Sequence, residues 1–365
     1  MANLHQFVPT FEPGAVGAHT VELQRLWRES GRGESEVFTE HVRGGFENEN
    51  RSHLFTDYGT KRFPAGRDDV LVYQMAIGSV VADFVKGRRE PLVLNHHNLT
   101  PVEYLERWEP TATWGVQWGQ AQLRDLAARS TLAVAVSHYN AAQLRGVGYR
   151  QVEVAPLLID VDAFDAQVEP EALDALTAAK AQGGTDWLFV GRLAANKCQH
   201  DVIKSFAMYR RVYDPGARLH LVGGAPADAY RAALEGLVST LGLRGAVSFT
   251  GPVSTGALAA YYRTADVYVC LSEHEGFCAP LLEAMHHSVP VVALAAAAIP
   301  ETVGDAGVLL AGKEPAMVAA AADRVVRDSA VRSALTTAGR RRVQDFGLAR
   351  SRSRWLDVLA QAVPS

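Results

Sequence analysis

The chain has 365 residues, of which 48% are hydrophobic and 21% charged, and its formal net charge is −4. This length suits two domains of similar size, and the composition is that of a soluble globular α/β protein. The slightly negative charge argues against nucleic acid as a partner.

No stretch approaches the ~20 consecutive apolar residues that a membrane helix needs, and the first residues lack the features of a signal peptide. The three cysteines are an odd number and show no metal-ligand spacing. We therefore expect a cytoplasmic protein. Basic clusters at residues 86–89 and 340–342 are typical of solvated helix ends, and they are also compatible with a peripheral membrane contact.

Strand-like apolar runs alternate with helical patterns along the chain, which is typical of parallel sheets built from βαβ units. In the first half, the expected strands span residues 5–11, 70–75, 92–95 and 132–137. The expected helices there span residues 18–29, 79–86, 101–107 and 118–129. Residues 44–64 show no periodicity and are expected to form a loop, and the turn-rich segment 160–170 is the expected linker.

The same alternation restarts after the linker. The strands expected in the second half span residues 187–190, 218–222, 247–250, 267–271 and 289–293. The helices expected there span residues 199–213, 227–241, 255–264, a segment from about 280, a broken helix at 315–343, and 348–362.

The most informative segment is Glu275-Gly-Phe-Cys-Ala-Pro-Leu-Leu-Glu283, which follows an apolar strand that ends at Ser272. Pro280 suits the start of a helix, so we expect Glu275 in the loop and Glu283 in the first helical turn. The free N–H groups of a helix start bind anions, whereas carboxylates accept hydrogen bonds from hydroxyls. A nucleotide-sugar, with phosphates in the middle and hydroxyl-bearing rings at both ends, fits this layout.

Several segments in order resemble glycosyltransferase family 4. Phe189-Val-Gly-Arg192-Leu-Ala-Ala-Asn-Lys197 resembles the VGRL…K segment of that family, and residues 272–285 are similar to its EGFG-x-P-x-x-EAM segment. Val289-Pro290-Val-Val, Ile299-Pro300-Glu301 and Gly304 continue the pattern. The resemblance is strong from about residue 188 to 310 and thinner before it.

The family resemblance implies a GT-B fold, in which two Rossmann-like parallel-sheet domains face each other across a cleft. It also implies retaining sugar transfer from a nucleoside diphosphate sugar. On this basis we expect an acceptor-side domain at 1–165, a donor-binding domain at 166–345, and a final helix at 346–365 that crosses back to the first domain.

Arg192 and Lys197 follow a strand end, where open α/β sheets place their ligands. Their expected task is to neutralise the diphosphate as the glycosidic bond breaks; two ordinary surface cations are the plain alternative. The family often has glycine after this lysine, whereas this chain has Cys198.

The resemblance implies that Glu275 accepts hydrogen bonds from donor-sugar hydroxyls and Glu283 from the ribose. An acid that simply stabilises the helix start is the alternative for Glu283. The backbone around the helix start is expected to face the diphosphate, and the end of an earlier strand to contact the base. These backbone candidates are Gly276, Phe277, Cys278, Ala279, Thr250 and Val253.

In the first half, Gly14 and Gly17 follow the first strand and allow a close backbone approach to phosphate; a tight turn is the alternative. His96 and His97 follow another strand end, and in the family a histidine at this place lies near the reacting sugar. Strand alternation does not choose between them, and we slightly prefer His97. A third metal ligand at helical spacing is missing beside this pair.

Two further patterns have plain alternatives. Asp160-Val-Asp162 spells a D-x-D sequence, but its context resembles the interdomain linker of the family, so no metal is expected. Trp108, Trp114 and Trp118 suit an acceptor groove or ordinary core packing.

The sequence thus predicts a retaining, metal-independent transferase of a hexose-type unit, with no cofactor besides the nucleotide-sugar. The UDP-, GDP- and ADP-linked donors all fit, as do small-molecule, lipid and glycan hydroxyl acceptors. A sugar-nucleotide epimerase, a pseudo-glycosyl coupling enzyme, and an inactive sugar-nucleotide-binding protein are the alternatives.

Overall fold

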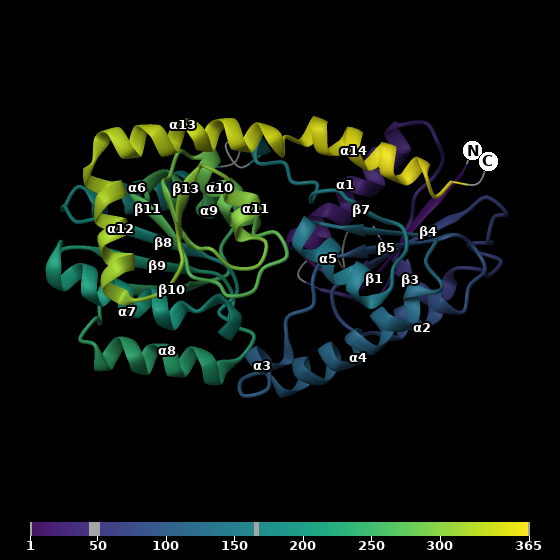
Figure 1. The fold of residues 1–365 in the computed structure, drawn as a ribbon, viewed down its shortest axis with the longest axis horizontal. Coiled ribbons are helices and arrows are strands. Elements are labelled where there is room, and N and C mark those ends of the chain that lie inside the picture. Colours follow the sequence, from purple (N-terminus) through teal and green to yellow (C-terminus); the bar gives the residue numbers. More distant parts are fainter. Residues whose placement is uncertain (1, 44–51, 164–167, 364–365) are drawn as a thin grey trace. The chain divides into compact units, whose positions relative to one another are not determined.

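The computed structural model describes residues 2–43, 52–163 and 168–363 and divides the chain into two compact units (Figure 1). Unit 1 comprises the described parts of 1–102, 111–159 and 346–365, and unit 2 those of 103–110 and 160–345. Each unit is built around its own parallel sheet with helices, so the expected α/β fold with two Rossmann-like sheets is confirmed. Parts of the predicted loop 44–64 and linker 160–170 lie outside the described residues.

Unit 1 contains a seven-stranded sheet in the order β3-β2-β1-β4-β5-β6-β7. Its strands are β1 (Leu4–Phe11), β2 (Val37–Val42), β3 (His53–Leu54), β4 (Val70–Met75), β5 (Leu92–His96), β6 (Leu132–Ala135) and β7 (Val152–Val154). Its helices are α1 (Ala15–Glu29), α2 (Val80–Lys86), α4 (Pro110–Ala127), α5 (His138–Val147) and α14 (Leu348–Ala360), with a 3-10 turn at Phe55–Asp57.

The unit 1 sheet buries both faces, because alternate residues of its strands enter two different cores. On β4, Leu71 and Tyr73 pack into one core with α2, while Val70 and Val72 pack into the other. The second core is closed by α1 and by α14, whose Trp355 is fully buried. Helix α14 lies beside α1 (Figure 1), and the Trp355 indole N–H donates to Pro156 O over 2.8 Å.

Unit 2 contains a six-stranded sheet in the order β10-β9-β8-β11-β12-β13. Its strands are β8 (Asp186–Val190), β9 (Arg218–Val222), β10 (Val247–Gly251), β11 (Val267–Cys270), β12 (Val291–Leu294) and β13 (Gly307–Leu310). Its helices are α6 (Pro170–Lys180), α7 (Gln199–Val212), α8 (Asp228–Thr240), α9 (Thr255–Thr264), α10 (Ala279–His286), α11 (Ile299–Val303), α12 (Pro315–Arg327) and α13 (Ser329–Asp345). The short helix α3 (Val102–Leu105) leads from unit 1 into the unit 2 segment 103–110.

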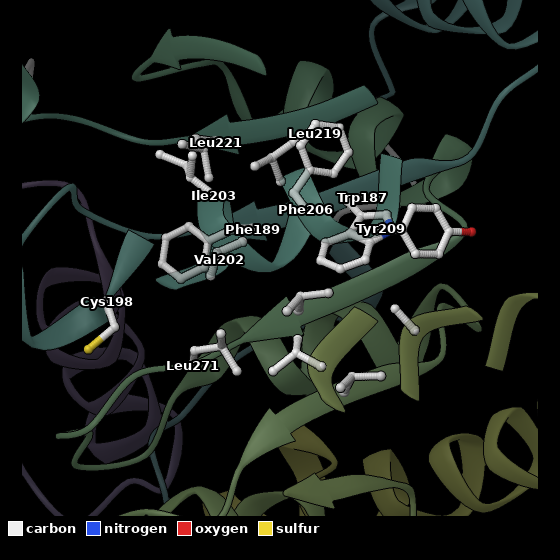
Figure 2. Packing of buried hydrophobic residues seen from close by; sticks show 14 of the residues in the cluster. Trp187, Phe189, Cys198, Val202, Ile203, Phe206, Tyr209, Leu219, Leu221 and Leu271 are labelled. Carbon is white, nitrogen blue, oxygen red and sulfur yellow. The ribbon is translucent and has the colours of Figure 1, made fainter. Parts of the chain in front are cut away.

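The main core of unit 2 lies between β8, β9 and helix α7. Figure 2 shows Trp187 and Phe189 of β8 among the side chains of α7, with Leu219 of β9 close by. The Trp187 ring lies 5.0 Å from that of Tyr209 and 5.6 Å from that of Phe206. This aromatic packing fixes β8, whose carboxyl end leads into the Arg192–Lys197 segment.

The predicted helix break within 315–343 is confirmed at Asp328. Its carboxylate accepts hydrogen bonds from the backbone N–H groups of Ala330 and Val331 over 3.0 and 3.1 Å, and this starts α13 as a new helix.

The predicted start of α4 was wrong, because Gly115 and Gly119 weaken the helical pattern there. Both glycines allow close packing on the segment 77–78: a Cβ on Gly119 would lie 2.7 Å from the Gly78 nitrogen, and one on Gly115 would lie 2.9 Å from the Ile77 side chain.

Seven further helices and strands were not predicted, and neither were the 3-10 turns at Phe55–Asp57 and, in unit 2, at Ala195–Lys197. The seven are β2, β3, β7, β13, α5, α6 and α11. Several are short or lie at a sheet edge, where alternation extends over few residues. Among the described residues, no helix combines the length and apolarity needed to cross a membrane.

Candidate functional site

The topological switch point of unit 2 lies between β8 and β11, which are neighbours in its sheet although six elements separate them in the chain. In parallel α/β sheets, ligands bind at the carboxyl ends of the strands at such a point. Two loops begin there: the segment 191–198 after β8 and the segment 271–278 after β11. The two strongest sequence motifs therefore flank one edge of one sheet.

Three glycines line this edge at the ends of consecutive strands. Gly191, Gly223 and Gly251 have φ values of 149°, 139° and 71°. A Cβ on Gly223 would lie 2.2 Å from Gly191 O, so the two backbones meet where a side chain has no room. Gly251 ends the strand that carries Thr250, whose hydroxyl donates to Gly251 O over 2.8 Å; Val253 follows, half-buried.

Lys197 and Glu275 form a close ion pair at the switch point. The Lys197 Nζ lies 2.6 Å from both carboxylate oxygens of Glu275, and both side chains are largely buried. Burial opposes the charge on Lys197, but the Glu275 carboxylate overcomes this and raises the pKa of the ammonium group. The sequence placed these residues on separate parts of a ligand, whereas the structure brings them into direct contact.

The backbones of the two loops are joined by hydrogen bonds from Asn196, which the sequence reasoning missed. Asn196 O accepts the Glu273 N–H over 2.9 Å, and the Asn196 side chain donates to His274 O over 3.0 Å. Two further hydrogen bonds hold the far end of the loop. The Ala298 N–H donates to Glu275 O, and the Thr302 hydroxyl donates to Phe277 O. Glu275 is therefore positioned by backbone contacts on both sides.

Arg192 differs from Lys197 because its side chain is exposed, and the described residues offer it no hydrogen bond or ion pair. Its backbone is fixed, since the Gln199 side chain donates to Arg192 O over 2.8 Å. An exposed guanidinium beside the glycine-lined edge is available to an anion.

Helix α10 begins at Ala279, and Cys278 occupies the N-cap without a side-chain cap. Pro280 lies at the helix start as predicted, and Gly276, Phe277 and Cys278 are buried in the turn that leads into the helix. The first N–H groups of a helix have no partner within the helix. The loop thus offers backbone donors to an anion next to Lys197.

Glu283 does not lie in the first turn of α10, so that prediction was wrong. The helix starts at Ala279, and the dipole of its N-terminus acts mainly within the first turn. Instead, Glu283 is buried and accepts a hydrogen bond from the Tyr262 hydroxyl over 2.7 Å. Burial raises the pKa of Glu283 to about 7, and the Tyr262 hydrogen bond only partly offsets this effect.

The carboxyl edge of the unit 1 sheet has a different chemistry, because buried amide side chains form a chain across neighbouring strands. Asn95 Nδ2 donates to Gln74 Oε1, Gln74 Nε2 to Gln6 Oε1, and Gln6 Nε2 to Thr20 O, each over 2.8 Å. The three side chains are fully buried on β5, β4 and β1.

Two histidines join this amide chain. His97 Nε2 lies 2.6 Å from Gln74 Oε1 and donates to it, and the His19 ring lies 3.0 Å from the Asn95 amide. The Leu158 N–H donates to His19 Nδ1. Burial lowers the pKa of His19 to about 3 and also lowers that of His97, so both rings are neutral at physiological pH.

His96 and His97 have different environments. His96 is the last residue of β5 and is 1% exposed, whereas His97 lies beyond the strand and is only partly buried. His97 is thus the member of the pair that joins the Gln74 network and still reaches the surface.

Gly14 and Gly17 also occupy different positions. Gly14 is the N-cap of α1 with φ 140°, and a Cβ there would meet open space, so its backbone conformation rather than crowding favours glycine. Gly17 is buried inside the first turn of α1. The helix begins three residues before the predicted start at Ala18.

The three tryptophans do not form one cluster. Trp108 packs in unit 2 with its ring 5.2 Å from that of Tyr230, while Trp114 and Trp118 lie on α4 in unit 1.

The two acids of the D-x-D sequence have separate partners. Asp160 accepts the Ala163 N–H over 3.1 Å, and Asp162 lies 3.6 Å from His286.

Two groups of side chains in unit 2 have metal-ligand character: Cys270, Glu275 and Cys278, and Cys198, His200 and Asp201. A lysine already contacts each group. Lys197 binds both oxygens of Glu275, and Lys313 lies 2.6 Å from Asp201. A metal ion would have to displace an ammonium group at either place.

Comparison with known proteins gives one consistent family. Residues 178–342 match the family model described as glycosyl transferases group 1. A D-inositol 3-phosphate glycosyltransferase of Geodermatophilus obscurus is 34% identical over 215 residues, which cover 57% of this chain and 45% of the relative. One from Streptosporangium roseum is 29% identical over 315 residues, which cover 82% of this chain and 71% of the relative.

Solved structures show the same fold. The HepE protein of Anabaena in complex with UDP has a TM-score of 0.77 at 20% identity, covering 98% of this chain and 99% of that one. Sucrose-phosphate synthase from Thermosynechococcus elongatus has a TM-score of 0.74 at 20% identity, covering 99% of both chains. At such identities the likeness shows the fold alone.

Proposed function

We propose that this chain, whose residues 178–342 match the group 1 glycosyltransferase model and whose fold is GT-B, transfers a hexose-type sugar from a nucleoside diphosphate sugar to an acceptor hydroxyl. The observation that carries the proposal is the Lys197–Glu275 pair beside the start of α10, at the switch point of unit 2. Solved relatives contain UDP and UDP-glucose, which supports a nucleotide-sugar as donor.

In this proposal unit 2 binds the donor. Arg192, Lys197 and the backbone around the start of α10 contact the diphosphate and neutralise the charge that develops on it as the glycosidic bond breaks. Glu275 contacts the sugar hydroxyls, and Lys197 remains close enough to bind both this carboxylate and a phosphate oxygen. The two cations supply the positive charge that the leaving diphosphate needs, which supports a reaction independent of metal ions.

The Glu283 carboxylate accepts hydrogen bonds from the ribose hydroxyls, and the hydrogen bond from the Tyr262 hydroxyl orients this carboxylate. Tyr262 remains a donor because burial and the nearby Glu283 charge raise its pKa well above 10. The backbone at Thr250 and Val253 contacts the base. Backbone contacts allow uracil, guanine or adenine.

Unit 1 supplies the acceptor side of the reaction in this proposal. Its neutral amide and imidazole groups suit hydroxyls, and His97 is the candidate that contacts the reacting sugar or the acceptor. Retention of configuration follows if the acceptor attacks the face that the diphosphate leaves and the leaving phosphate takes the acceptor proton. That route requires no basic side chain.

Donor turnover over a panel of UDP-, GDP- and ADP-sugars tests the proposal. The full-length protein is incubated with each donor, with and without an acceptor panel, in buffer containing a chelator, and products are identified by NMR. We expect release of one nucleoside diphosphate, acceptor-dependent stimulation, and a product with the donor's anomeric configuration. An inverted product, strict dependence on divalent metal, or an epimerised nucleotide-sugar would contradict it.

A further inference from the structure

Two cysteine thiols face each other at the proposed donor site. Cys270 ends β11 and is completely buried, and Cys278 is the N-cap of α10 and is 8% exposed. Their Sγ atoms lie 3.9 Å apart, and both thiols are free. The loop between them contains Glu275, so the pair brackets the residue that binds Lys197.

The backbone of Cys278 is strained in a way that favours glycine. Its φ and ψ are 67° and 64°, a left-handed conformation that is unfavourable for an L-residue with a Cβ. This chain nevertheless has a cysteine there, and its thiol contacts a second thiol. Packing alone does not require a thiol at this position, since a glycine would relieve the strain.

Cys198 provides an internal comparison because it is also buried and left-handed, with φ 52°. Its Sγ lies 3.5 Å from Lys313 Nζ and 3.5 Å from Ala195 O. The chain thus has one cysteine pair and one cysteine that contacts other groups.

We propose that Cys270 and Cys278 are a reversible redox site that forms a disulfide when a peroxide oxidises it. Cys278 is the less buried residue of the two, at 8% exposed against 0%, so we assign the attack on the peroxide to its thiolate. In this step the O–O bond breaks, and a sulfenic acid and hydroxide form. Cys270 then attacks the sulfenic sulfur and the S–O bond breaks. The sum is two thiols and one hydrogen peroxide giving one disulfide and two waters.

Cys270 takes the second step because it is completely buried and its Sγ lies 3.9 Å from the sulfur that is oxidised first. Its hydrogen bond with Cys278 lowers the pKa of Cys270, whereas the same contact and burial raise that of Cys278. Cys270 is therefore the better resolving nucleophile. The raised pKa of Cys278 makes its attack the slow step, so oxidation requires excess peroxide or long exposure.

The disulfide would change the donor site. An S–S bond is about 2.05 Å long, so the sulfur atoms must approach by nearly half of their present separation. Cys278 then shifts together with the backbone donors at the start of α10, and the Glu275 loop is closed into a ring. We expect at least a tenfold loss of transferase activity; this consequence rests on the proposed function, while the disulfide itself does not.

The test treats the reduced full-length protein with hydrogen peroxide and counts thiols after unfolding, with peptide mass spectrometry to locate any disulfide. We expect three titratable thiols to fall to one, a Cys270–Cys278 crosslink, and recovery with dithiothreitol. Cys198→Ala should form the same crosslink. Cys270→Ala and Cys270→Ser should form none, and peptide mass spectrometry should instead find a sulfenic acid or a higher oxide on their Cys278.

Two results in folded wild-type protein would overturn the inference: overoxidation of Cys278 without a crosslink, or a crosslink that involves Cys198. Three unchanged thiols after prolonged exposure would also overturn it. A crosslink in protein whose reduced form shows no sugar transfer would support the redox site and reject the proposed function. A crosslinked enzyme with full transferase activity would reject the effect on the donor site.

Discussion

The carboxyl edges of the two sheets have opposite chemical character. In unit 2 the edge has an exposed guanidinium at Arg192, a close ammonium–carboxylate pair at Lys197 and Glu275, and a buried acid at Glu283. In unit 1 the corresponding edge has neutral amides and imidazoles connected by hydrogen bonds. The same sheet architecture thus provides one edge suited to phosphate charge and another suited to hydroxyl groups.

The side chains at the two edges are held in place by different interactions: ion pairs in unit 2 and neutral hydrogen bonds in unit 1. Charges at the unit 2 edge compensate one another, so losing one member leaves another charge buried without its partner. Neutral groups at the unit 1 edge form a chain in which Gln6 and Gln74 both donate and accept, while Asn95 donates. We therefore expect charge substitutions to affect catalysis first and amide substitutions to affect folding first.

The largest effect is expected for Lys197→Ala, which should lower turnover by ~10²-fold or more, because it removes charge stabilisation of the leaving diphosphate. The matched control is Lys313→Ala. Lys313 also contacts two carboxylates of unit 2, on Asp201 and Glu273, but has no proposed contact with the donor. Steady-state kinetics compares the two, and similar losses in both variants would indicate a structural effect only.

Glu275→Gln should lower turnover at least tenfold while leaving nucleoside diphosphate affinity unchanged or higher. The substitution removes the carboxylate that binds the sugar, and it frees Lys197 for the phosphates. Kinetics with a nucleotide-sugar and calorimetry with the nucleoside diphosphate separate the two effects. A parallel loss of both quantities would mean that Glu275 acts only by holding Lys197.

Gln74→Leu should destabilise unit 1 by about 1–3 kcal/mol, since buried groups of Gln6, Asn95 and His97 lose their partner. Urea unfolding measures the loss. Gln117→Leu on the exposed face of α4 is the control and should change stability by less than about 0.5 kcal/mol. Equal stability of the two variants would show that the amide chain adds nothing to folding.

The smallest effect concerns pH and Glu283. Its raised pKa of about 7 means that the free protein holds this carboxyl protonated below neutral pH, and ribose hydroxyls need the ionised form as acceptor. The KM for the donor should therefore rise several-fold as the pH falls from 8 to 6. Glu283→Gln should flatten this dependence; an unchanged profile would assign it to another group.

Much of unit 2 could be predicted from the sequence because its chemical groups lie in short contiguous segments. Arg192 and Lys197 follow one strand, and Glu275 and Glu283 flank one helix start, so local spacing locates them. The contact between Lys197 and Glu275 could not be predicted, since 78 residues separate them. Tyr262 and Asn196 were missed for the same reason.

The network of unit 1 was missed because each segment contributes a single residue. Gln6, Gln74 and Asn95 come from three strands, and His19 comes from a helix. A signal was nevertheless present: each strand has a polar residue within an apolar run. Such residues are buried only when they have partners, so their repetition across strands indicates a shared network.

Calorimetric titration of UDP, GDP and ADP into the wild-type protein and Lys197→Ala measures directly whether the charged edge of unit 2 binds the donor diphosphate, as we claim. We predict that at least one of the three nucleotides binds the wild type, that Lys197→Ala weakens it at least tenfold, and that Lys313→Ala does not. Failure of all three nucleotides to bind, or equal binding to wild type and Lys197→Ala, would contradict the claim.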